Sequence, residues 1–417
     1  MCLAAAVLPV VVLPIAGAGA QSARWWKGNT HTHTLWSDGD DFPESVAAWY
    51  KRNGYHFVSL TDHNTVATEE KWWPVPAAGL GREAYDKYRA SRVQSAGARP
   101  IDERRVGDTL RVRLRRPAEY APELNAAGRF LLVAGEEITQ YLARRGAHTT
   151  ALNLVEVIPA QPGTTLVEML RRDLEAAREQ EKRTGHEINV VFNHPNFLWS
   201  QTAEDVLKLP ALRFFEVYNG HPLVNILGDS VHASNERIWD IVSTHRFASG
   251  GGPLYGLATD DSHDYHRFGP DQRNPGRGWI SVRSARLDAD SLMAAMRRGD
   301  FYASTGVELS DIRHERGSLT VEVVPSKGVT YTTQFIGTRR GWDTTSVAVR
   351  DSTGRPVTRR YSKDVGTVLA EVTGTTATYR FRGDELYVRA RVVSSKPKAN
   401  GYLPREVEMA WTQPMRP

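Results

Sequence analysis

Short apolar segments, spaced along the first three quarters of the chain and separated by helix-like stretches, constrain its fold most strongly. They are rich in β-branched and aromatic residues and nearly continuous, as strands buried on both faces of a parallel sheet are. Between them, Leu166, Met169, Leu170 and Leu174 recur at helical spacing before Gly185. This alternation predicts an α/β fold, either a barrel or a doubly wound sheet. The expected strands cover residues 55–60, 129–134, 188–192, 213–218, 254–258 and 279–282.

Two regions depart from this rhythm. Residues 64–128 are polar and rich in Arg, with several Pro and Gly, and a loop of that length inside a domain is usually functional or partly disordered. We expect an insertion that covers or flanks the site, or else a solvated surface excursion. After residue 306, apolar and polar residues alternate in short segments between turns, which is typical of antiparallel strands with one face exposed to solvent. Residues 306–417 are therefore expected to form a small antiparallel β-sandwich.

The N-terminus has the pattern of an export signal. Residues 3–16 are apolar and the small residues GAGA follow, ending at Ala20. This predicts a signal peptide over residues 1–20 and a periplasmic or secreted protein, although no Lys or Arg precedes the apolar run. A transmembrane anchor is the alternative, but the run is short and contains Pro9 and Pro14.

Composition limits the chemistry that is available. The single cysteine is Cys2, so a disulfide framework, a Cys-ligated zinc and a thiol nucleophile are excluded. Any metal site must use His and carboxylates. The 53 Lys and Arg against 48 Asp and Glu give a net charge of +5, which mildly favours anionic substrates. It does not indicate a nucleic-acid-binding protein, which usually shows a clustered basic face.

Side chains that can bind metals follow most of the expected strands. His31 and His33 are two apart, so in an extended segment they face the same way. Each motif is weak alone, but together they fall where the loops of a parallel α/β fold converge and active sites form. Imidazole with carboxylate and no thiolate favours Zn, Fe or Mn. The candidates are His31, His33, Asp38, Asp62, His63, Glu136, Glu137, His148, His194, Asp260, Asp261 and His263.

These motifs resemble, in order, those of the polymerase and histidinol phosphatase (PHP) domain family. The resemblance rests on HTHTLWSDG, TDHN, GEEI, the His of HTTALNL, NHP and DDSH, and covers residues 25–305. It implies a distorted parallel (β/α) barrel with two or three divalent ions, Zn, Mn or Fe. The family spacing G-x-E-aliphatic selects Glu137 over Glu136, and D-x-H selects Asp261 over Asp260. The implied ligands are His31, His33, Asp38, His63, Glu137, His148, His194, Asp261 and His263.

The C-terminal part is similar to one branch in particular. YVRARVVS and EMAWTQP, together with the long insertion, resemble the secreted PHP proteins related to carbaryl hydrolase.

The resemblance also implies how the ligands are grouped. His31, His33 and Asp261 would hold one ion, His148 and His194 a second with Glu137 bridging, and Asp38, His63 and His263 a third. Two ions about 3.5–4 Å apart can activate a shared water for attack on phosphorus. Asp261 and His194 are the implied catalytic residues.

Residues near the implied ligands are candidates for other roles. Asp62 is expected either to orient an imidazole or to cap a helix. Asn219, His221 and Arg277 are candidates for substrate binding, with a turn as the alternative for the first two and surface charge for Arg277.

The expected activity is a metal-dependent hydrolase, most simply a phosphoesterase acting on monoesters or diesters. The alternatives are a carbamate or carboxylic ester hydrolase on the same cluster, a 5′-to-3′ exonuclease, and a non-enzymatic binding module. We expect an anionic small-molecule or oligomeric ester as substrate. A stable nucleic-acid complex is not expected, nor is a membrane contact beyond the export signal.

Overall fold

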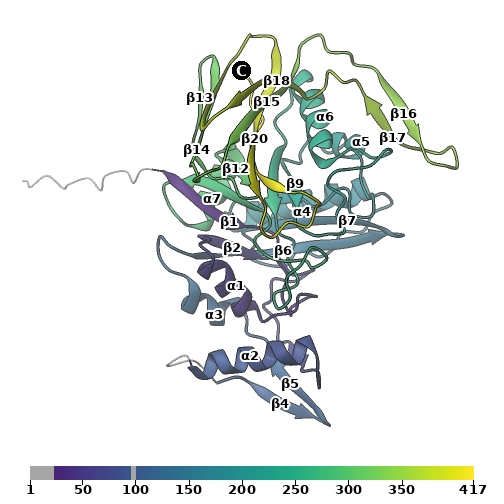
Figure 1. Cartoon of the computed structure of the whole chain (residues 1–417). Coiled ribbons are helices and arrows are strands. Elements are labelled where there is room, and N and C mark those ends of the chain that lie inside the picture. Colours follow the sequence, from purple (N-terminus) through teal and green to yellow (C-terminus); the bar gives the residue numbers. More distant parts are fainter. Residues whose placement is uncertain (1–22, 95–99) are drawn as a thin grey trace, which may run out of the picture.

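A single long sheet organises the computed structural model, which describes residues 23–94 and 100–417 (Figure 1). The expected signal peptide therefore lies outside the described residues. No helix in the described ranges is long and apolar enough to cross a membrane. In spatial order the strands are β10 (Tyr255–Thr259), β9 (Phe214–Asn219), β8 (Asn189–Phe192), β7 (Arg145–Leu152), β6 (Leu131–Leu142), β2 (Phe57–Leu60), β1 (Arg24–Asn29), β11 (Trp279–Ser284), β12 (Phe301–Ser304), β21 (Val407–Thr412), β20 (Glu385–Pro397), β15 (Tyr331–Arg339) and β18 (Thr367–Thr373).

The six expected strands are present as β2, β6, β8, β9, β10 and β11, but the sheet is mixed. Strands β1, β2 and β6 are parallel, as are β8, β9 and β10. Between these groups β7 runs antiparallel to both neighbours. It forms a hairpin with β6 through a tight turn in which Ala143 has φ 55°. The expectation of a purely parallel barrel is therefore corrected to a mixed sheet.

The ladder of the described strands does not close into a barrel. Strand β10 ends the sheet and lies against β11 and β12 without pairing with them. The side-chain amide of Gln413 takes the place of a neighbouring strand there. It accepts from Gly256 N at 2.8 Å and donates to Gly256 O at 2.9 Å, which satisfies part of the free edge.

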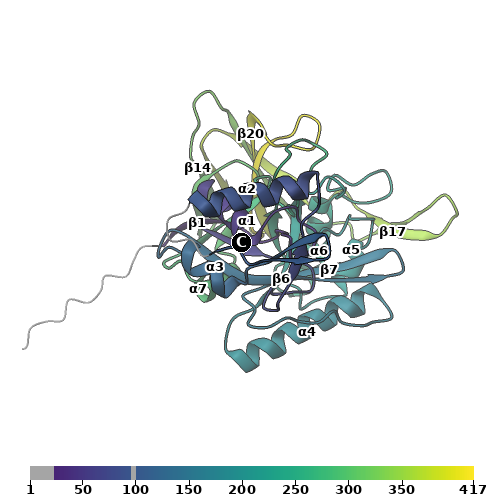
Figure 2. The same ribbon diagram turned by 90° about the horizontal axis from the view of Figure 1, so that it is seen from below.

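Helices cover the sheet where the sequence predicts them. Helix α4 begins after Thr165, whose side chain accepts from Glu168 N, and ends at Gly185 with φ 77°. It packs its apolar face on β6, β7 and β8 (Figure 2). The helices of this part are α1 (Pro43–Arg52), α3 (Pro117–Leu124), α4 (Leu166–Thr184), α5 (Ala203–Leu207), α6 (Asn235–Ala248) and α7 (Ala289–Arg298).

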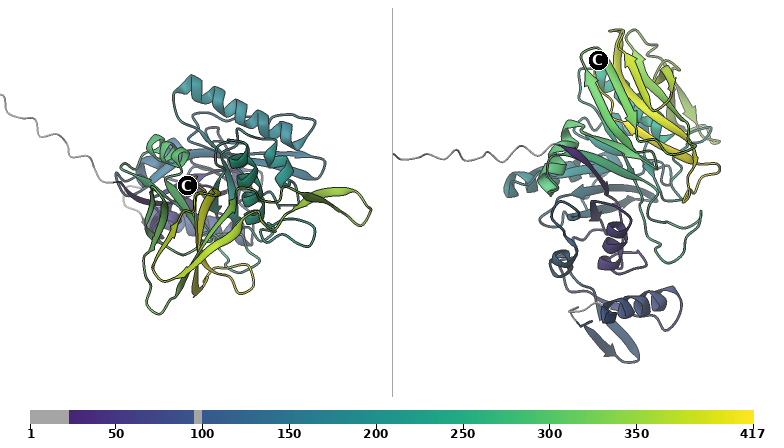
Figure 3. Two further views of the ribbon diagram at one scale, coloured as in Figure 1. Left: turned by 90° about the horizontal axis from the view of Figure 1, so that it is seen from above. Right: turned by 60° about the vertical axis from the view of Figure 1, so that its left-hand side comes forward.

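The Arg-rich insertion folds into a lobe of its own, at the opposite end of the molecule from the C-terminal sheets (Figure 3). Its short strands β3 (Trp72–Pro74), β5 (Thr109–Arg113) and β4 (Glu103–Val106) form a sheet beside α2 (Leu80–Gln94). Val112 and Leu114 alternate with exposed or half-exposed Arg and join a cluster with Trp36 and Phe42. The lobe therefore flanks the loop that carries Asp38.

Glu119 makes the lobe sensitive to acid. Hydrogen bonds from the Arg113 guanidinium and from Arg116 lower the pKa of Glu119 to about 2 from an ordinary 4.5. Because the folded-state pKa is depressed, its stabilisation is present above pH 4.5 and is lost as the pH falls toward 2. We expect Glu119→Gln to lower the urea midpoint at pH 7 and to have a much smaller effect near pH 2.5. A difference of equal size at both pH values would contradict this assignment.

The C-terminal part has two antiparallel layers, as a sandwich has, but one layer is shared. Strands β13 (Leu309–Glu315), β14 (Ser318–Val323) and β19 (Thr376–Arg380) pack over β15, β20 and β21 through a common apolar core. A hairpin of β16 (Ser346–Arg350) and β17 (Pro356–Tyr361) projects from this layer (Figure 1). Because β21 pairs with β12, the long sheet runs across the expected boundary at residue 306 without a break.

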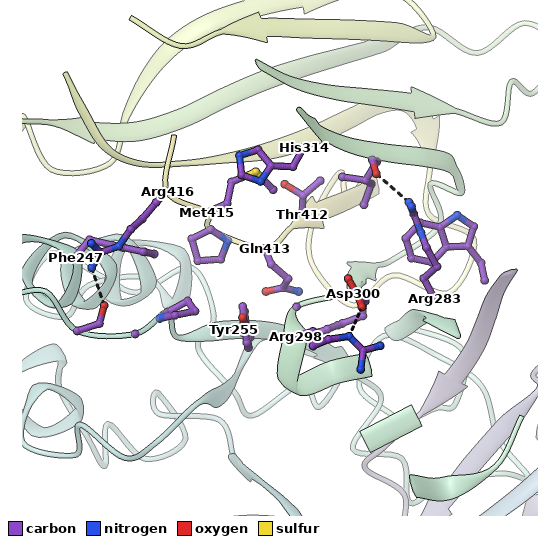
Figure 4. A pocket seen from close by; sticks show the side chains of 18 of the residues that line it. Phe247, Tyr255, Arg283, Arg298, Asp300, His314, Thr412, Gln413, Met415 and Arg416 are labelled. Atoms are coloured by element: carbon purple, nitrogen blue, oxygen red, sulfur yellow. Dashed lines mark hydrogen bonds and ion pairs between the residues drawn. The ribbon is translucent and has the colours of Figure 1, made fainter. Parts of the chain in front are cut away.

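A buried ion pair also fastens the two parts. Arg389 of β20 is 1% exposed and binds both carboxylate oxygens of Asp240 in α6, at 2.8 Å each. The Tyr387 hydroxyl donates to Asp240 as well, at 2.9 Å. Beside this contact, a cavity of about 580 Å³ lies between the parts, lined by Phe247, Tyr255 and Met415 among others (Figure 4). It opens near the first residues of β10, at the end of that strand away from residues 260–263.

Candidate metal centre

The nine implied ligand side chains meet at one end of the sheet. They come from six strands or the loops directly after them, as expected for an active site of an α/β fold. Most are buried, whereas Asp38 is half exposed and His63 is partly exposed. By element, His31 and His33 follow β1, with Asp38 further along the same loop; His63 follows β2; Glu137 is in β6; His148 is in β7; His194 follows β8; and Asp261 and His263 follow β10.

Glu137 is the centre of the cluster. Both of its carboxylate oxygens are surrounded by imidazole nitrogens from five different histidines. Its Oε1 lies 3.4 Å from His31 Nε2, 3.2 Å from His148 Nδ1 and 3.3 Å from His194 Nε2, and its Oε2 lies 3.5 Å from His33 Nε2 and 2.9 Å from His63 Nδ1.

Asp261 and Asp38 complete the arrangement on either side. Asp261 Oδ1 is 3.3 Å from both His31 Nε2 and His33 Nε2. Asp38 Oδ1 is 3.3 Å from His263 Nε2 and 3.5 Å from His63 Nε2. Each carboxylate therefore lies within 3.5 Å of at least two imidazole nitrogens.

The donor sets found in the structure overlap more than the implied grouping. Glu137, His148 and His194 form one set, and His33, Asp38, His63 and His263 form another. His31 lies with His194 and Asp261 in one set and with His33 and Glu137 in a further one. The difference from the implied grouping is that His31, His33 and His194 each belong to two sets.

These spacings fit divalent cations better than hydrogen bonds. Two ligand atoms held about 2.0–2.1 Å from one ion at a tetrahedral angle are about 3.4 Å apart. Most of the separations between imidazole and carboxylate atoms of the cluster lie between 3.2 and 3.5 Å. In addition, His31 Nε2, His33 Nε2 and both ring nitrogens of His148 are buried without a hydrogen-bond partner. Lone pairs of this kind are expected where an ion completes the site.

Electrostatics keeps the carboxylates ionised. Burial alone raises the pKa of Glu137, but the surrounding imidazoles outweigh it and hold the pKa well below the usual range. The same balance lowers the pKa of Asp261. For His33, burial and the nearby His263 lower the pKa to about 3, so its imidazole is neutral. For His31, His63 and His194 the neighbouring carboxylates outweigh burial and raise the pKa, so a metal ion that binds there displaces protons from these rings.

Glu216 in β9 is the buried acid that sequence analysis missed. Its Oε1 accepts from His31 Nδ1 at 2.7 Å and from the Thr259 hydroxyl at 2.8 Å. Its Oε2 accepts from His194 N at 2.9 Å and from Asn219 Nδ2 at 2.8 Å. Because Nδ1 of His31 then carries the proton, the Nε2 lone pair faces Glu137 and Asp261. The available signal was an acidic residue inside an apolar strand segment, RFFEVY.

We expect Glu216→Gln to weaken metal binding by about ten- to a hundredfold, as loss of a charged partner behind a ligand histidine does. Competition with a chromophoric chelator would measure the affinity. A matched control is Glu385→Gln, because Glu385 is also a buried carboxylate and accepts from the Tyr379 hydroxyl at 2.6 Å in the C-terminal part. If both variants bound metal as the wild type does, Glu216 would have no influence on the cluster.

Carboxylates adjacent in sequence to the ligands have separate structural roles. Asp62 accepts from Thr34 N and from the Thr34 and Ser37 hydroxyls at 2.6–2.8 Å, so it holds the loop after β1. It neither caps a helix nor bonds an imidazole. Asp260 accepts from three backbone amides at residues 276–278, and Glu136 accepts from Ile158 N. In each acidic pair, the member that faces the cluster is the one the motif spacing selects.

Of the three substrate-binding candidates, one lies at the cluster and two make hydrogen bonds that support the structure around it. His221 lies at the cluster, with its ring 5.6 Å from that of His263. Asn219 Nδ2 donates to Asp261 Oδ2 at 3.1 Å and to Glu216, so its amide supports ligands. Arg277 is fully buried, and its guanidinium donates to backbone carbonyls of Gly220, Gly269, Gln272 and Asn400. Arg277 is therefore not the free cation that the sequence suggested, because its guanidinium is buried and already donates to four backbone carbonyls.

Comparison with known proteins finds distant structural likeness only. No protein-family model and no curated protein sequence matches the chain.

Among solved structures, a two-domain protein of Bacteroides vulgatus, described as containing a predicted PHP-like metal-dependent phosphoesterase, is 14% identical. The match covers 94% of this chain and 96% of that one, with a TM-score of 0.39. A candidate metal-dependent phosphoesterase of Bifidobacterium adolescentis is 14% identical over 65% of this chain and 94% of its own, with a TM-score of 0.32.

An amidohydrolase of Chromobacterium violaceum is 13% identical over 57% and 88%, with a TM-score of 0.29. Likeness at this level does not establish a family or an activity for this chain, so its function rests on the residues of the site.

Proposed function

We propose that the chain is a metal-dependent hydrolase of the PHP type, acting as a phosphoesterase. The observation that carries this proposal is the convergence of nine imidazole and carboxylate side chains, with Glu137 at their centre, at ligand-to-ligand distances. When bound there, two or three divalent ions such as Zn, Mn or Fe supply a water of lowered pKa and Lewis acidity toward an ester.

The surrounding residues prepare the site for a substrate. Asp261 and His194, the proposed catalytic residues, both adopt positive φ, 49° and 22°, which is uncommon outside glycine and typical of functional sites. His221 accepts from Leu223 N through Nδ1, so its neutral ring carries the proton on Nε2. We assign that Nε2–H to substrate binding beside the cluster.

A carbamate or carboxylic ester is the second candidate substrate, and the rim of the site favours it. Tyr141 lies 5.2 Å from the His148 ring and is 53% exposed. Leu198 and Leu223 are also exposed, on loops joined by the bridge between Phe197 and Val224. The nearby Arg273 is paired with Asp264 at 2.8 Å. Apolar side chains next to a paired cation suit an ester with an uncharged organic substituent.

The nuclease alternative has weaker support. Trp26 is buried in the core, and Trp73 packs within the insertion lobe against the cluster that contains Phe42 and Val112, so these two aromatic side chains are not free platforms for bases. We retain export to the periplasm or the exterior as a proposal from residues 1–20.

The test is to express the chain from Gln21, count its metals by elemental analysis and assay it on three esters. These are bis-p-nitrophenyl phosphate, p-nitrophenyl phosphate and an aryl carbamate, with His31→Ala and Asp261→Ala as variants. Two or three ions per chain and phosphoester turnover that both variants lose would support the proposal. Turnover of the carbamate alone would favour the second candidate. Less than one ion per chain, or turnover that survives both substitutions, would overturn the metal-dependent mechanism.

A further inference from the structure

The connection between β20 and β21, residues 398–406, reaches from the C-terminal part to the back of the metal centre. We call this segment the clasp. In Figure 1 it is the yellow loop beside β9. Lys398 is almost fully buried and its Nζ donates to the Tyr218 hydroxyl at 2.6 Å and to Glu406 Oε1 at 3.0 Å. Glu406 in turn accepts from the Tyr218 hydroxyl at 2.8 Å. These bonds fix both ends of the clasp to Tyr218, near the end of β9.

The middle of the clasp reaches the ligand shell through Tyr402. Its hydroxyl donates to the carbonyl oxygen of Asn219 at 2.8 Å. The side-chain amide of the same Asn219 donates to Asp261 Oδ2 at 3.1 Å and to Glu216 Oε2 at 2.8 Å. Glu216 holds His31. A single residue, Asn219, therefore separates Tyr402 from two carboxylates that shape the cluster.

Arg277 joins the same network from the other side. Its guanidinium donates to the clasp carbonyl of Asn400 at 3.0 Å and to Gly220 O at 2.8 Å. Its own carbonyl accepts from Lys398 Nζ, and its Cζ lies 5.2 Å from the Tyr402 ring centroid. The end of β9, which carries Asn219, and the loop after β10, which carries Asp261, are thus held together through the clasp.

We propose that Tyr402 is a positioning residue, which sets the affinity of the cluster for divalent cations by holding Asn219 against Asp261 and Glu216. This inference rests on the proposed metal site but not on the identity of the substrate. Without the Tyr402 hydroxyl, the carbonyl oxygen of Asn219 loses the hydrogen bond that it accepts. The end of β9, whose Asn219 side chain holds Asp261, then becomes more mobile. The ligands themselves stay in place, so the loss is one of preorganisation.

The test is Tyr402→Phe, with Tyr379→Phe as the matched control. Tyr379 also loses a hydroxyl bonded to a buried acceptor, Glu385 Oε1 at 2.6 Å, but lies in β19 away from the cluster. Mn²⁺ and Zn²⁺ affinities would be measured by chelator competition, and thermal unfolding would be followed in metal-free protein. We expect about a three- to tenfold loss of affinity in Tyr402→Phe and none in Tyr379→Phe, with small and similar changes in metal-free Tm.

The readout separates this proposal from the proposed function. Wild-type protein that binds ions but hydrolyses none of the esters would contradict the proposed function. The role of Tyr402 would still be decided by the measured metal affinities. Unchanged affinity in Tyr402→Phe, or an equal loss in both variants, would overturn the positioning role. So would wild-type protein that binds neither ion, because there would then be no affinity to set.

Discussion

Glu137→Gln is expected to remove bound metal and to reduce ester turnover to background. The carboxylate lies between five imidazoles and contacts at least one member of every donor set. Its amide counterpart keeps the shape but loses the charge that balances His31 and His63. We expect metal affinity to fall by at least about a hundredfold, the upper limit for losing an outer partner of a ligand. Elemental analysis after gel filtration would measure the retained metal.

The neighbouring acid provides a matched control. Glu136 is equally buried but points to the other face of β6, where it accepts from Ile158 N. Burial raises its pKa to about 8, so it is protonated at neutral pH and glutamine replaces it closely. Glu136→Gln should keep metal and turnover. If the two variants behaved alike, the assignment of Glu137 as the central ligand would be wrong.

Arg389→Met is expected to lower the free energy of unfolding by about 3–5 kcal/mol, the usual cost of leaving a buried charge unpaired. Asp240 would keep only the Tyr387 hydroxyl in place of its two bonds to the guanidinium. The loss should appear in urea unfolding of metal-free protein, because Arg389 lies at the contact of α6 with β20 rather than at the cluster.

Two further variants define this effect. Arg355→Met removes an ion pair with Asp351 whose Arg side chain is 79% exposed, and should leave stability unchanged. The double variant Arg389→Met with Asp240→Asn should recover part of the loss, since no charge is then left unpaired. A decrease below about 1 kcal/mol for Arg389→Met alone would mean that water reaches Asp240.

The convergence of the nine side chains could be predicted from the sequence because the relevant information is local. Each motif places a donor at the end of a short apolar segment, and strand ends of an α/β sheet converge. The spacing of the resembled family selects Glu137 over Glu136, and only one of the two can face the cluster because adjacent residues of β6 face opposite sides. The six apolar strands were also predictable, because each is encoded locally as a short run of β-branched and aromatic residues.

What the sequence could not supply depends on distant contacts. Glu216 resembles any acid within a strand until His31 is seen to lie 2.7 Å from it. Arg277 resembles a free cation until the fold brings four carbonyls to its guanidinium. The turn at Ala143 that reverses β7 lacks the Asn-Gly or Asp-Gly signal of tight hairpins, so the mixed sheet was not foreseen.

The pairing of β12 with β21 has a consequence for the order in which the protein folds. Domains commonly fold from the N-terminus during synthesis. Here residues 302–304 of β12 pair with residues 410–412 of β21. Gln413 bonds to the free edge of β10. The metal-binding part cannot reach its final structure until residues 407–413 have been synthesised. Chains that stop short of β21 would therefore leave the edges of β12, β20 and β10 open and be prone to aggregate.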